Sequence, residues 1–358
     1  MSFARWLLAA AFFGLFSAST AAEPCRIAFD LGSSGIRAGG SAGATTARTD
    51  IDYLGPLWAG RGLEETEAAT VAALRELPEK AGLGADCVRV GGGFSAWRLA
   101  LQQDSAALAA LLARLRAASG VAVLVMPQLR EGAYGYFGAR QLLGEQLTTS
   151  HILDIGGGSL QIAGEQSSFG TALGQKIWHR HLCQEIRNSE STPCTLQPMT
   201  GDELAIAREL LAARLGEVAT ALPAAVSLTA ISRPVSRGVA PAVHRLSGAS
   251  GQPTGFSRPA LTAAIERIAR LTREETASLL GSPASYVAYL LSDMLLVEGL
   301  LQATGSDRLE VAELDLTNLP GLLADDRAFA WEQHYDCYLD RLRSQGLDAY
   351  ASDPASCP

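Results

Sequence analysis

The sequence has little positive charge, few charged residues in total and few aromatic ones. Its 29 Lys and Arg residues are outnumbered by 37 Asp and Glu, which gives a formal net charge of -8. Such a chain lacks the basic excess that attracts nucleic acid without regard to base sequence, so we expect no nucleic-acid partner. Any anion that it binds must be held by local geometry.

Long hydrophobic runs are missing beyond the N-terminus. Residues 1–5 are short and basic, residues 6–16 are apolar and residues 17–22 are small, an order typical of a secretory signal peptide. The apolar part is short for a membrane span. No later stretch is long and uncharged enough to replace it as an anchor. We therefore expect a periplasmic or secreted protein without a stable membrane anchor.

Cysteines are few, but their number is even. An exported chain with six cysteines is expected to use them in structural disulfides, although sequence alone permits fifteen pairings. Proximity along the chain favours pairing Cys183 with Cys194 and Cys337 with Cys357, which leaves Cys25 with Cys87.

Only five histidines are present, and none lies in a context diagnostic of catalysis. His179, His181 and Cys183 could bind a metal, but no second ligand pair at finger-like spacing supports this alternative.

A serine hydrolase is a second alternative. In "VRVGGGFSAWRLA", Ser95 lies between an expected glycine turn at residues 91–93 and a helix, as in a nucleophile elbow. Two non-glycine residues follow Ser95 where the G-x-S-x-G motif requires glycine, which weakens this interpretation.

Glycine is abundant, and two glycine-rich stretches have the same plan. "IAFDLGSSGIRAGG" and "ILDIGGGSLQIAGE" each read as strand, Asp, apolar residue, Gly, small residues and strand. Two similar hairpins more than a hundred residues apart indicate a duplicated domain.

The segments around these hairpins alternate between strand and helix patterns, which favours a layered α/β fold with mixed sheets in two lobes. The expected domains are a signal peptide at 1–22, lobe I at 23–147, lobe II at 148–326 and a disulfide-stapled C-terminal extension at 327–358. Helices are expected near residues 63–77, 104–118, 132–147, 202–220, 258–271, 273–280 and 284–304, and strands near 87–90, 121–126 and 309–312.

The two hairpin loops could hold a phosphate, because their uncovered backbone N–H groups can converge on one anion. Asp30 and Asp154 would repel a phosphate directly, so their useful role is to hold a hydrated divalent cation, for which Mg²⁺ is the best fit. The alternative is that each loop is only a tight turn. The candidate phosphate-binding residues in the loops are Gly32, Ser33, Ser34, Gly156, Gly157, Gly158 and Ser159.

Glu131 is the candidate general base, because it follows the apolar strand that ends at Met126 and strand ends are where ligands gather in α/β domains. The alternative for Glu131 is a partner of the helix dipole. Arg98 is a candidate phosphate ligand, since a guanidinium can make two parallel hydrogen bonds to a phosphate edge. The alternative for Arg98 is an ordinary surface arginine.

The sequence resembles the Ppx/GppA family of exopolyphosphatases and guanosine pentaphosphate phosphatases over about residues 26–323. "FDLGSSGIR", "FSAWRLALQ", "REGAYGYFGA" and "LDIGGGSLQ" carry the resemblance. It implies two actin-like, ribonuclease H-like lobes with the substrate phosphates and a divalent metal between them. It also implies Glu131 as general base, Arg98 as phosphate ligand and both aspartates on the metal side.

Some residues depart from that family toward the apyrases, or nucleoside triphosphate diphosphohydrolases. Gln161 stands where Ppx/GppA proteins carry a second glutamate, and as an amide it can position a water but not deprotonate it. A separate departure from the Ppx/GppA pattern is found at residues 235–243, "VSRGVAPAV", which retain only Gly238 of an expected glycine-rich loop. We therefore expect this third part of the cleft to be remodelled.

The expected activity is Mg²⁺-dependent removal of terminal phosphate from polyphosphate. The alternatives are hydrolysis of nucleoside di- and triphosphates or guanosine pentaphosphate, and a phosphate-binding protein that has lost turnover.

Overall fold

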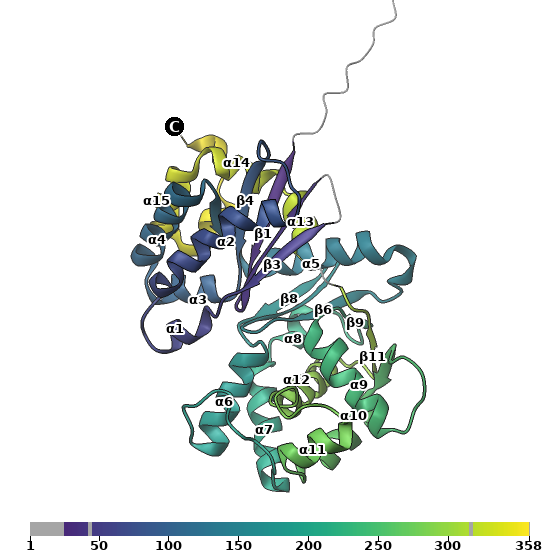
Figure 1. Ribbon diagram of the computed structural model, residues 1–358. Helices are drawn as coiled ribbons and strands as arrows, with labels where there is room; N and C mark the ends of the chain where they lie inside the picture. The colour runs from purple at the N-terminus through teal and green to yellow at the C-terminus, as the bar shows by residue number, and fades with distance from the viewer. Residues whose placement is uncertain (1–24, 42–44, 315–317, 358) are drawn as a thin grey trace, which may run out of the picture.

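The computed structural model describes residues 25–41, 45–314 and 318–357, which form two α/β lobes (Figure 1). The expected fold class is therefore confirmed, whereas the expected signal peptide lies outside the described residues. Within the described ranges, no helix is both long and apolar enough to cross a membrane.

Lobe I contains a five-stranded mixed sheet in the order β3-β2-β1-β4-β5. β2 and β3 are antiparallel to their neighbours, whereas β4 runs parallel to β1 and to β5. The strands are β1 (Arg26–Leu31), β2 (Gly35–Gly40), β3 (Thr46–Asp50), β4 (Val88–Gly93) and β5 (Ala122–Val125). The helices are α1 (Leu54–Trp58), α2 (Glu67–Lys80), α3 (Ala96–Gln103), α4 (Ser105–Ser119) and α5 (Gln128–Leu143).

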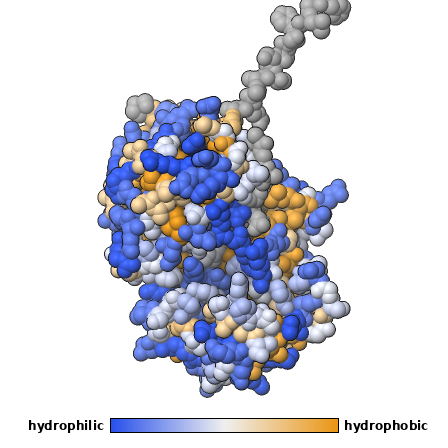
Figure 2. Space-filling view, in the orientation of Figure 1, coloured by the Kyte–Doolittle hydropathy of each residue, from blue (hydrophilic) through white to orange (hydrophobic). Residues whose placement is uncertain are grey.

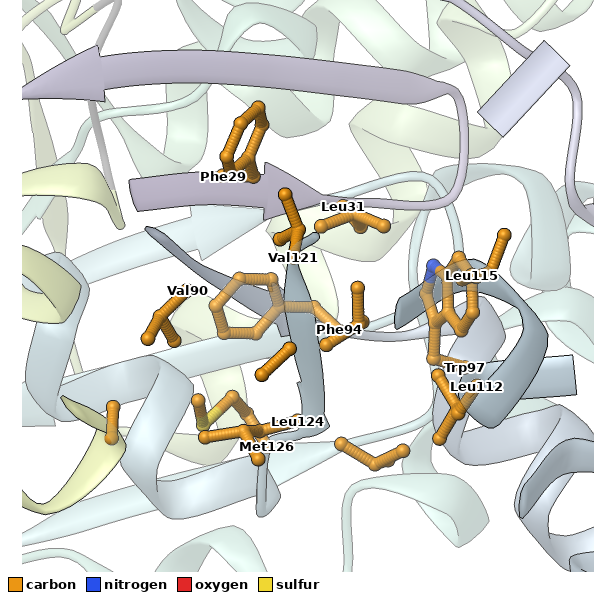
Figure 3. Close-up of a cluster of buried hydrophobic side chains, with 14 of the residues drawn as sticks. Phe29, Leu31, Val90, Phe94, Trp97, Leu112, Leu115, Val121, Leu124 and Met126 are labelled. Atoms are coloured by element: carbon orange, nitrogen blue, oxygen red, sulfur yellow. The ribbon is translucent and has the colours of Figure 1, made fainter. Parts of the chain in front are cut away.

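Apolar side chains from the central strands fill the core of lobe I. Figure 3 shows Phe94 in the middle of this core, with Val90 of β4 beside it and Leu124 of β5 next to Met126, and these side chains and Phe29 of β1 are fully or almost fully buried. Strands covered by helices on the sheet faces are expected to be apolar almost throughout, as β5 is.

Lobe II contains a six-stranded mixed sheet in the order β10-β11-β9-β6-β7-β8. Its strands are β6 (His151–Ile155), β7 (Leu160–Gly164), β8 (Ser168–Thr171), β9 (Leu228–Ala230), β10 (Gly255–Ser257) and β11 (Arg308–Val311). Its helices are α6 (Gln175–Arg187), α7 (Gly201–Arg214), α8 (Val218–Ala221), α9 (Ala240–Leu246), α10 (Arg258–Ala269), α11 (Arg273–Leu280) and α12 (Leu290–Ala303), and a π-helix spans Pro234–Val239.

The two predicted hairpins have matching registers. Asp30 of β1 pairs with Arg37 of β2, and Asp154 of β6 pairs with Gln161 of β7. One backbone hydrogen bond closes each hairpin loop. The Gly32 N–H donates to the Gly35 carbonyl at 3.0 Å, and the Gly156 N–H donates to the Ser159 carbonyl at 2.8 Å. The repeated sequence pattern therefore corresponds to a repeated structure.

The expected turn at residues 91–93 is wrong, because these glycines end β4. Gly93 pairs with Leu31 on one side and Val125 on the other. A Cβ added at Gly93 would lie 2.9 Å from the Trp97 ring, so glycine here permits close packing instead of a reversal. The chain turns one residue later, at Phe94 and Ser95.

Several expected helices have other limits, among them α5, which spans Gln128–Leu143 instead of 132–147 and therefore contains Glu131. The helix expected at 202–220 is two helices, α7 and α8, and the helix expected at 284–304 begins only at Leu290, after turns that follow Pro283.

The C-terminal residues return to lobe I as α13 (Leu319–Leu323), α14 (Asp326–Gln333) and α15 (Tyr335–Gln345) (Figure 1). α13, expected within lobe II, packs against β1 and α5 of lobe I. Tyr335 donates a hydrogen bond to the Val123 carbonyl, and the Val125 N–H donates to the Tyr338 hydroxyl. Because β5 is an edge strand, these bonds satisfy backbone groups that would otherwise be unpaired.

All six cysteines form the three expected disulfides, Cys25–Cys87, Cys183–Cys194 and Cys337–Cys357. Three disulfides are typical of proteins that fold in an oxidising, extracytoplasmic compartment.

The metal site considered at His179, His181 and Cys183 does not form. Cys183 is bonded to Cys194, and the two ring nitrogens of His179 lie within hydrogen-bond distance of Ser292 Oγ and the Cys194 carbonyl. The His181 ring packs against Trp178.

An apolar patch is visible at the right of the face shown in Figure 2, where α5 projects from the molecule. The exposed large apolar side chains of α5 are Leu129, Phe137 and Leu142, whereas Glu131 on another face of the helix is buried. Helix α5 therefore carries Glu131 toward the interior.

Candidate active site

A cavity of about 360 Å³ lies where the two hairpin loops meet. The loops approach so closely that a Cβ at Gly157 would lie 2.4 Å from Ser33 Oγ. Residues from both lobes line the cavity, among them the predicted Asp30, Gly32, Ser33, Ser34, Glu131, Asp154, Gly156, Gly157 and Ser159. The structure therefore brings most of the predicted residues together.

The N-terminus of α6 holds the second loop in place. The N–H groups of Gln175 and Lys176 donate to the carbonyls of Gly156 and Gly157, at 2.9 and 2.8 Å. A Cβ at Gly174 would lie 2.4 Å from the Ser159 nitrogen and 2.4 Å from the Gly156 carbonyl. Glycine at position 174 therefore lets the helix approach the loop.

Several backbone N–H groups in the two loops have no partner. The amides of Ser33, Ser34, Gly157, Gly158 and Ser159 donate no hydrogen bond to another described residue. Successive unpaired amides in a concave loop are a typical anion-binding arrangement. The unpaired amides favour the phosphate-binding interpretation over a simple tight turn.

Three carboxylates face the cavity. Burial and the negative charge of Glu131 together raise the pKa of Asp30 to about 7, although the positive charge of Arg37 opposes the shift. Burial, together with the negative charges of Glu131 and Asp30, raises the pKa of Asp154 to about 7.

These aspartates accept few hydrogen bonds from the described residues. Asn318 donates to Asp30 at 3.4 Å, and Asp154 accepts no hydrogen bond and joins no ion pair among the described residues. Clustered carboxylates without compensating donors are the ligands that a hard divalent cation prefers. The residues present therefore fit a hydrated cation such as Mg²⁺.

Glu131 is paired with Arg98. An Arg98 nitrogen donates to Glu131 Oε2 at 2.6 Å, and both side chains are buried. Arg98 also donates to the Met126 carbonyl at 3.0 Å and to Ser159 Oγ at 3.1 Å. Arg98 is not among the residues that line the cavity, so in this arrangement it holds Glu131 and Ser159.

Gln161 also lies behind the cavity wall. Its side chain is almost fully buried, and Nε2 donates to Ser159 Oγ at 3.2 Å. Ser159 thus joins Arg98 and Gln161 to the loop, and Gln161 does not face the cavity in this arrangement.

Ser95 lines the cavity at the turn between β4 and α3. Its backbone has φ 42° and ψ -93°, and its buried hydroxyl has no partner among the described residues. A Cβ at Gly158 would lie 2.3 Å from Ser95 Oγ, so this hydroxyl lies against the second loop. A strained serine between strand and helix is the arrangement of a nucleophile elbow, but no described residue that lines the cavity is a histidine.

Sequence reasoning missed several residues of the cavity wall. Arg37, Arg48 and Arg233 line it and add positive charge beside the three carboxylates. Gln175 also lines the cavity, and no motif in the sequence around it indicates this position. Arg37 could have been found, since the hairpin register places it opposite Asp30.

Comparison with known proteins relates this chain to one protein family. Residues 95–317 match the Ppx/GppA phosphatase family. A search of curated proteins found no match.

Solved structures share the fold. An exopolyphosphatase from Cytophaga hutchinsonii is 17% identical, with 84% of this chain and 96% of that chain covered and a TM-score of 0.59. A Ppx/GppA family member from Aquifex aeolicus is 16% identical, with the same coverages of 84% and 96% and a TM-score of 0.58. At these identities the structures show a common actin-like fold, and the family match extends over more than half of the sequence. The chain therefore belongs to the Ppx/GppA phosphatase family.

Proposed function

We propose that this protein hydrolyses the terminal phosphoanhydride bond of polyphosphate with the help of a divalent cation. The observation that supports this most strongly is the convergence of Asp30, Asp154 and Glu131 on one cavity between two loops with unpaired amides. Phosphoryl transfer depends chiefly on positioning and on charge stabilisation, which is what such an arrangement offers.

In the proposed reaction a water oxygen attacks the terminal phosphorus, and the bond to the bridging oxygen breaks. Glu131 accepts the proton of the attacking water, while the shorter polyphosphate leaves with the bridging oxygen. The loop amides stabilise negative charge on the transferred group. Arg98 keeps Glu131 and Ser159 in position from behind the wall, and Asp30 and Asp154 would hold Mg²⁺, whose positive charge would offset that of the phosphates.

The lining of the cavity favours polyphosphate over a nucleotide. Arg37, Arg48 and Arg233 place positive charge in the cavity wall, which suits a ligand with many negative charges, although Arg48 also pairs with Asp50. No aromatic side chain belongs to the described lining residues, so the cavity lacks a ring on which a nucleobase could stack.

A substrate panel tests the proposal. Phosphate release is measured from polyphosphate, ATP, ADP and guanosine pentaphosphate, with and without Mg²⁺. We expect release from polyphosphate that requires Mg²⁺ and exceeds release from the nucleotides. Faster release from ATP or ADP would instead support an apyrase-like activity.

A binding protein without turnover is the second candidate. It is favoured by the position of Gln161 behind Ser159 and by the engagement of Arg98 with Glu131. Retained binding of polyphosphate together with no release from any compound would support this candidate and remove the proposed enzymatic activity.

We also propose that the protein acts in the periplasm or outside the cell. The three disulfides and the N-terminal residues 1–22 support this location. Fractionation of cells that express the full chain would test it, and recovery of the protein with intact disulfides in the cytoplasm would contradict it.

A further inference from the structure

A buried acid stands directly behind one residue of the cavity wall. Gln175 lines the cavity at the first turn of α6, and its Nε2 donates to Asp293 Oδ2 at 2.5 Å. Asp293 lies on α12 and is only 4% exposed. The two side chains therefore connect the cavity with the interior of lobe II.

The position of Asp293 is costly for a carboxyl group. Its neighbours on α12 are mostly leucines, and its Oδ1 is buried without a hydrogen-bond partner. Among the described residues, no Lys or Arg pairs with it. A buried acid that no cation compensates needs another reason to be retained, because an apolar residue of similar size would stabilise α12 better.

The contact fixes the orientation of the Gln175 amide. A carboxyl oxygen that accepts from Nε2 directs the NH₂ group inward, which leaves Oε1 as the free polar atom of the amide. Gln175 Oε1 has no partner among the described residues. An acceptor there would repel phosphate oxygens but can accept a hydrogen bond from water.

Gln175 and the second aspartate, Asp154, line the same cavity. The Gln175 N–H donates to the carbonyl of Gly156, two residues after Asp154. Water molecules around a cation held by Asp154 are the donors that such an acceptor would meet, since Mg²⁺ keeps several of its waters when bound to protein.

We propose that Gln175 accepts a hydrogen bond from a hydration water of the divalent cation in the cavity, and that Asp293 is the positioning residue that turns the Gln175 carbonyl toward that water. This inference rests on the function proposed above. It assigns roles to two residues outside the loops and outside the pair of Arg98 and Glu131.

The test is direct measurement of Mn²⁺ binding by electron paramagnetic resonance, without substrate. Gln175→Met removes the acceptor at similar size, and Asp293→Leu removes the group that orients it. Both should weaken Mn²⁺ binding by about 10-fold, as is typical when an outer partner of a metal site is removed. Asp293→Asn keeps an acceptor for the Gln175 amide and should bind within about threefold of wild type.

Two controls fix the interpretation. Gln184→Met makes the same change on α6 at a residue whose side chain donates to the exposed Glu190, and it should leave Mn²⁺ binding unchanged. Asp154→Asn should abolish binding, which locates the ion in the cavity. Thermal unfolding shows whether each variant folds. If Asp293→Leu does not fold, the Mn²⁺ affinity of Gln175→Met alone tests the proposal.

The outcomes separate this inference from the proposed function. Wild-type affinity in both Gln175→Met and Asp293→Leu would overturn the inference even if polyphosphate is hydrolysed. Absence of Mn²⁺ binding in the wild type, or binding that survives Asp154→Asn, would also overturn it. Weakened binding in the two variants would support it even if no phosphate is released from any substrate.

Discussion

The carboxylate of Glu131 and the guanidinium of Arg98 form a buried ion pair with a nitrogen–oxygen distance of 2.6 Å. Glu131 comes from the first turn of α5 and Arg98 from α3, so the pair joins two helices of lobe I. The second contact of Arg98, to Ser159, extends this connection to the loop of lobe II. The candidate base is thus tied to the candidate phosphate loop by one guanidinium.

Glu131→Gln should lower kcat for phosphate release by about 10²-fold or more, because a glutamine cannot accept the proton of the attacking water. The fold should persist, since the amide oxygen can still accept from Arg98. The measurement is steady-state phosphate release, with the melting temperature as a check on folding. A variant that is folded and nearly as active as wild type would remove Glu131 from the role of base.

Arg98→Lys tests the bridging role of the guanidinium. A lysine ammonium carries the charge but not the fork that reaches Glu131, Ser159 and the Met126 carbonyl together. We expect a lower kcat in a protein that still folds. Arg98→Met should also destabilise the fold by about 3 kcal/mol or more, because it leaves the buried Glu131 charge uncompensated. Unfolding in urea measures the loss of stability in Arg98→Met separately from the loss of activity in Arg98→Lys. Equal stability of the two variants would contradict the expected role of the guanidinium charge.

The hairpins, the two lobes and the disulfides could be predicted from the sequence because their signals are local. Both hairpins have the same local pattern, in which a strand ends near an Asp and glycines follow. This pattern places Asp30 and Asp154 at equivalent positions of their hairpins. Cys183 and Cys194 are close enough in sequence for proximity to suggest their pairing.

The remaining features depend on contacts between distant segments. Nothing near Gln175 indicates that Asp293, 118 positions away, would lie behind it. The glycines of β4 suggested a turn, because sequence alone does not reveal that the Trp97 side chain needs their space. Helix α13 follows lobe II in the chain, but its apolar side chains pack into the core of lobe I.

Gly174→Ala should reduce activity strongly without unfolding the protein. The new Cβ would lie 2.4 Å from backbone atoms of the second loop, and backbone cannot move aside as a side chain can. We expect displacement of the loop amides and a loss of at least about 10-fold in kcat/KM, the order found when donors to the transition state are misplaced.

Two other glycines calibrate the effect of Gly174→Ala. Gly201→Ala is the matched control, since a Cβ at that position meets nothing within 4 Å. Gly157→Ala should be milder than Gly174→Ala, because its closest contact is the rotatable Ser33 side chain. Equal activities of Gly174→Ala and Gly201→Ala would contradict the proposed role of the second loop.

His179 should make the protein sensitive to acid. Burial lowers the pKa of His179 from about 6.5 to about 4, so the folded protein binds fewer protons there than the unfolded chain. The stability contributed by the neutral ring is complete above pH 6.5 and is lost as the pH falls toward 4, by about 3 kcal/mol in total. Unfolding in urea between pH 7 and pH 4 should therefore show a falling free energy in the wild type and a shallower fall in His179→Gln. If the free energies of unfolding of the wild type and His179→Gln fell in parallel, other groups would cause the acid sensitivity. The burial of His179 beside Ser292 would then not affect how stability depends on pH.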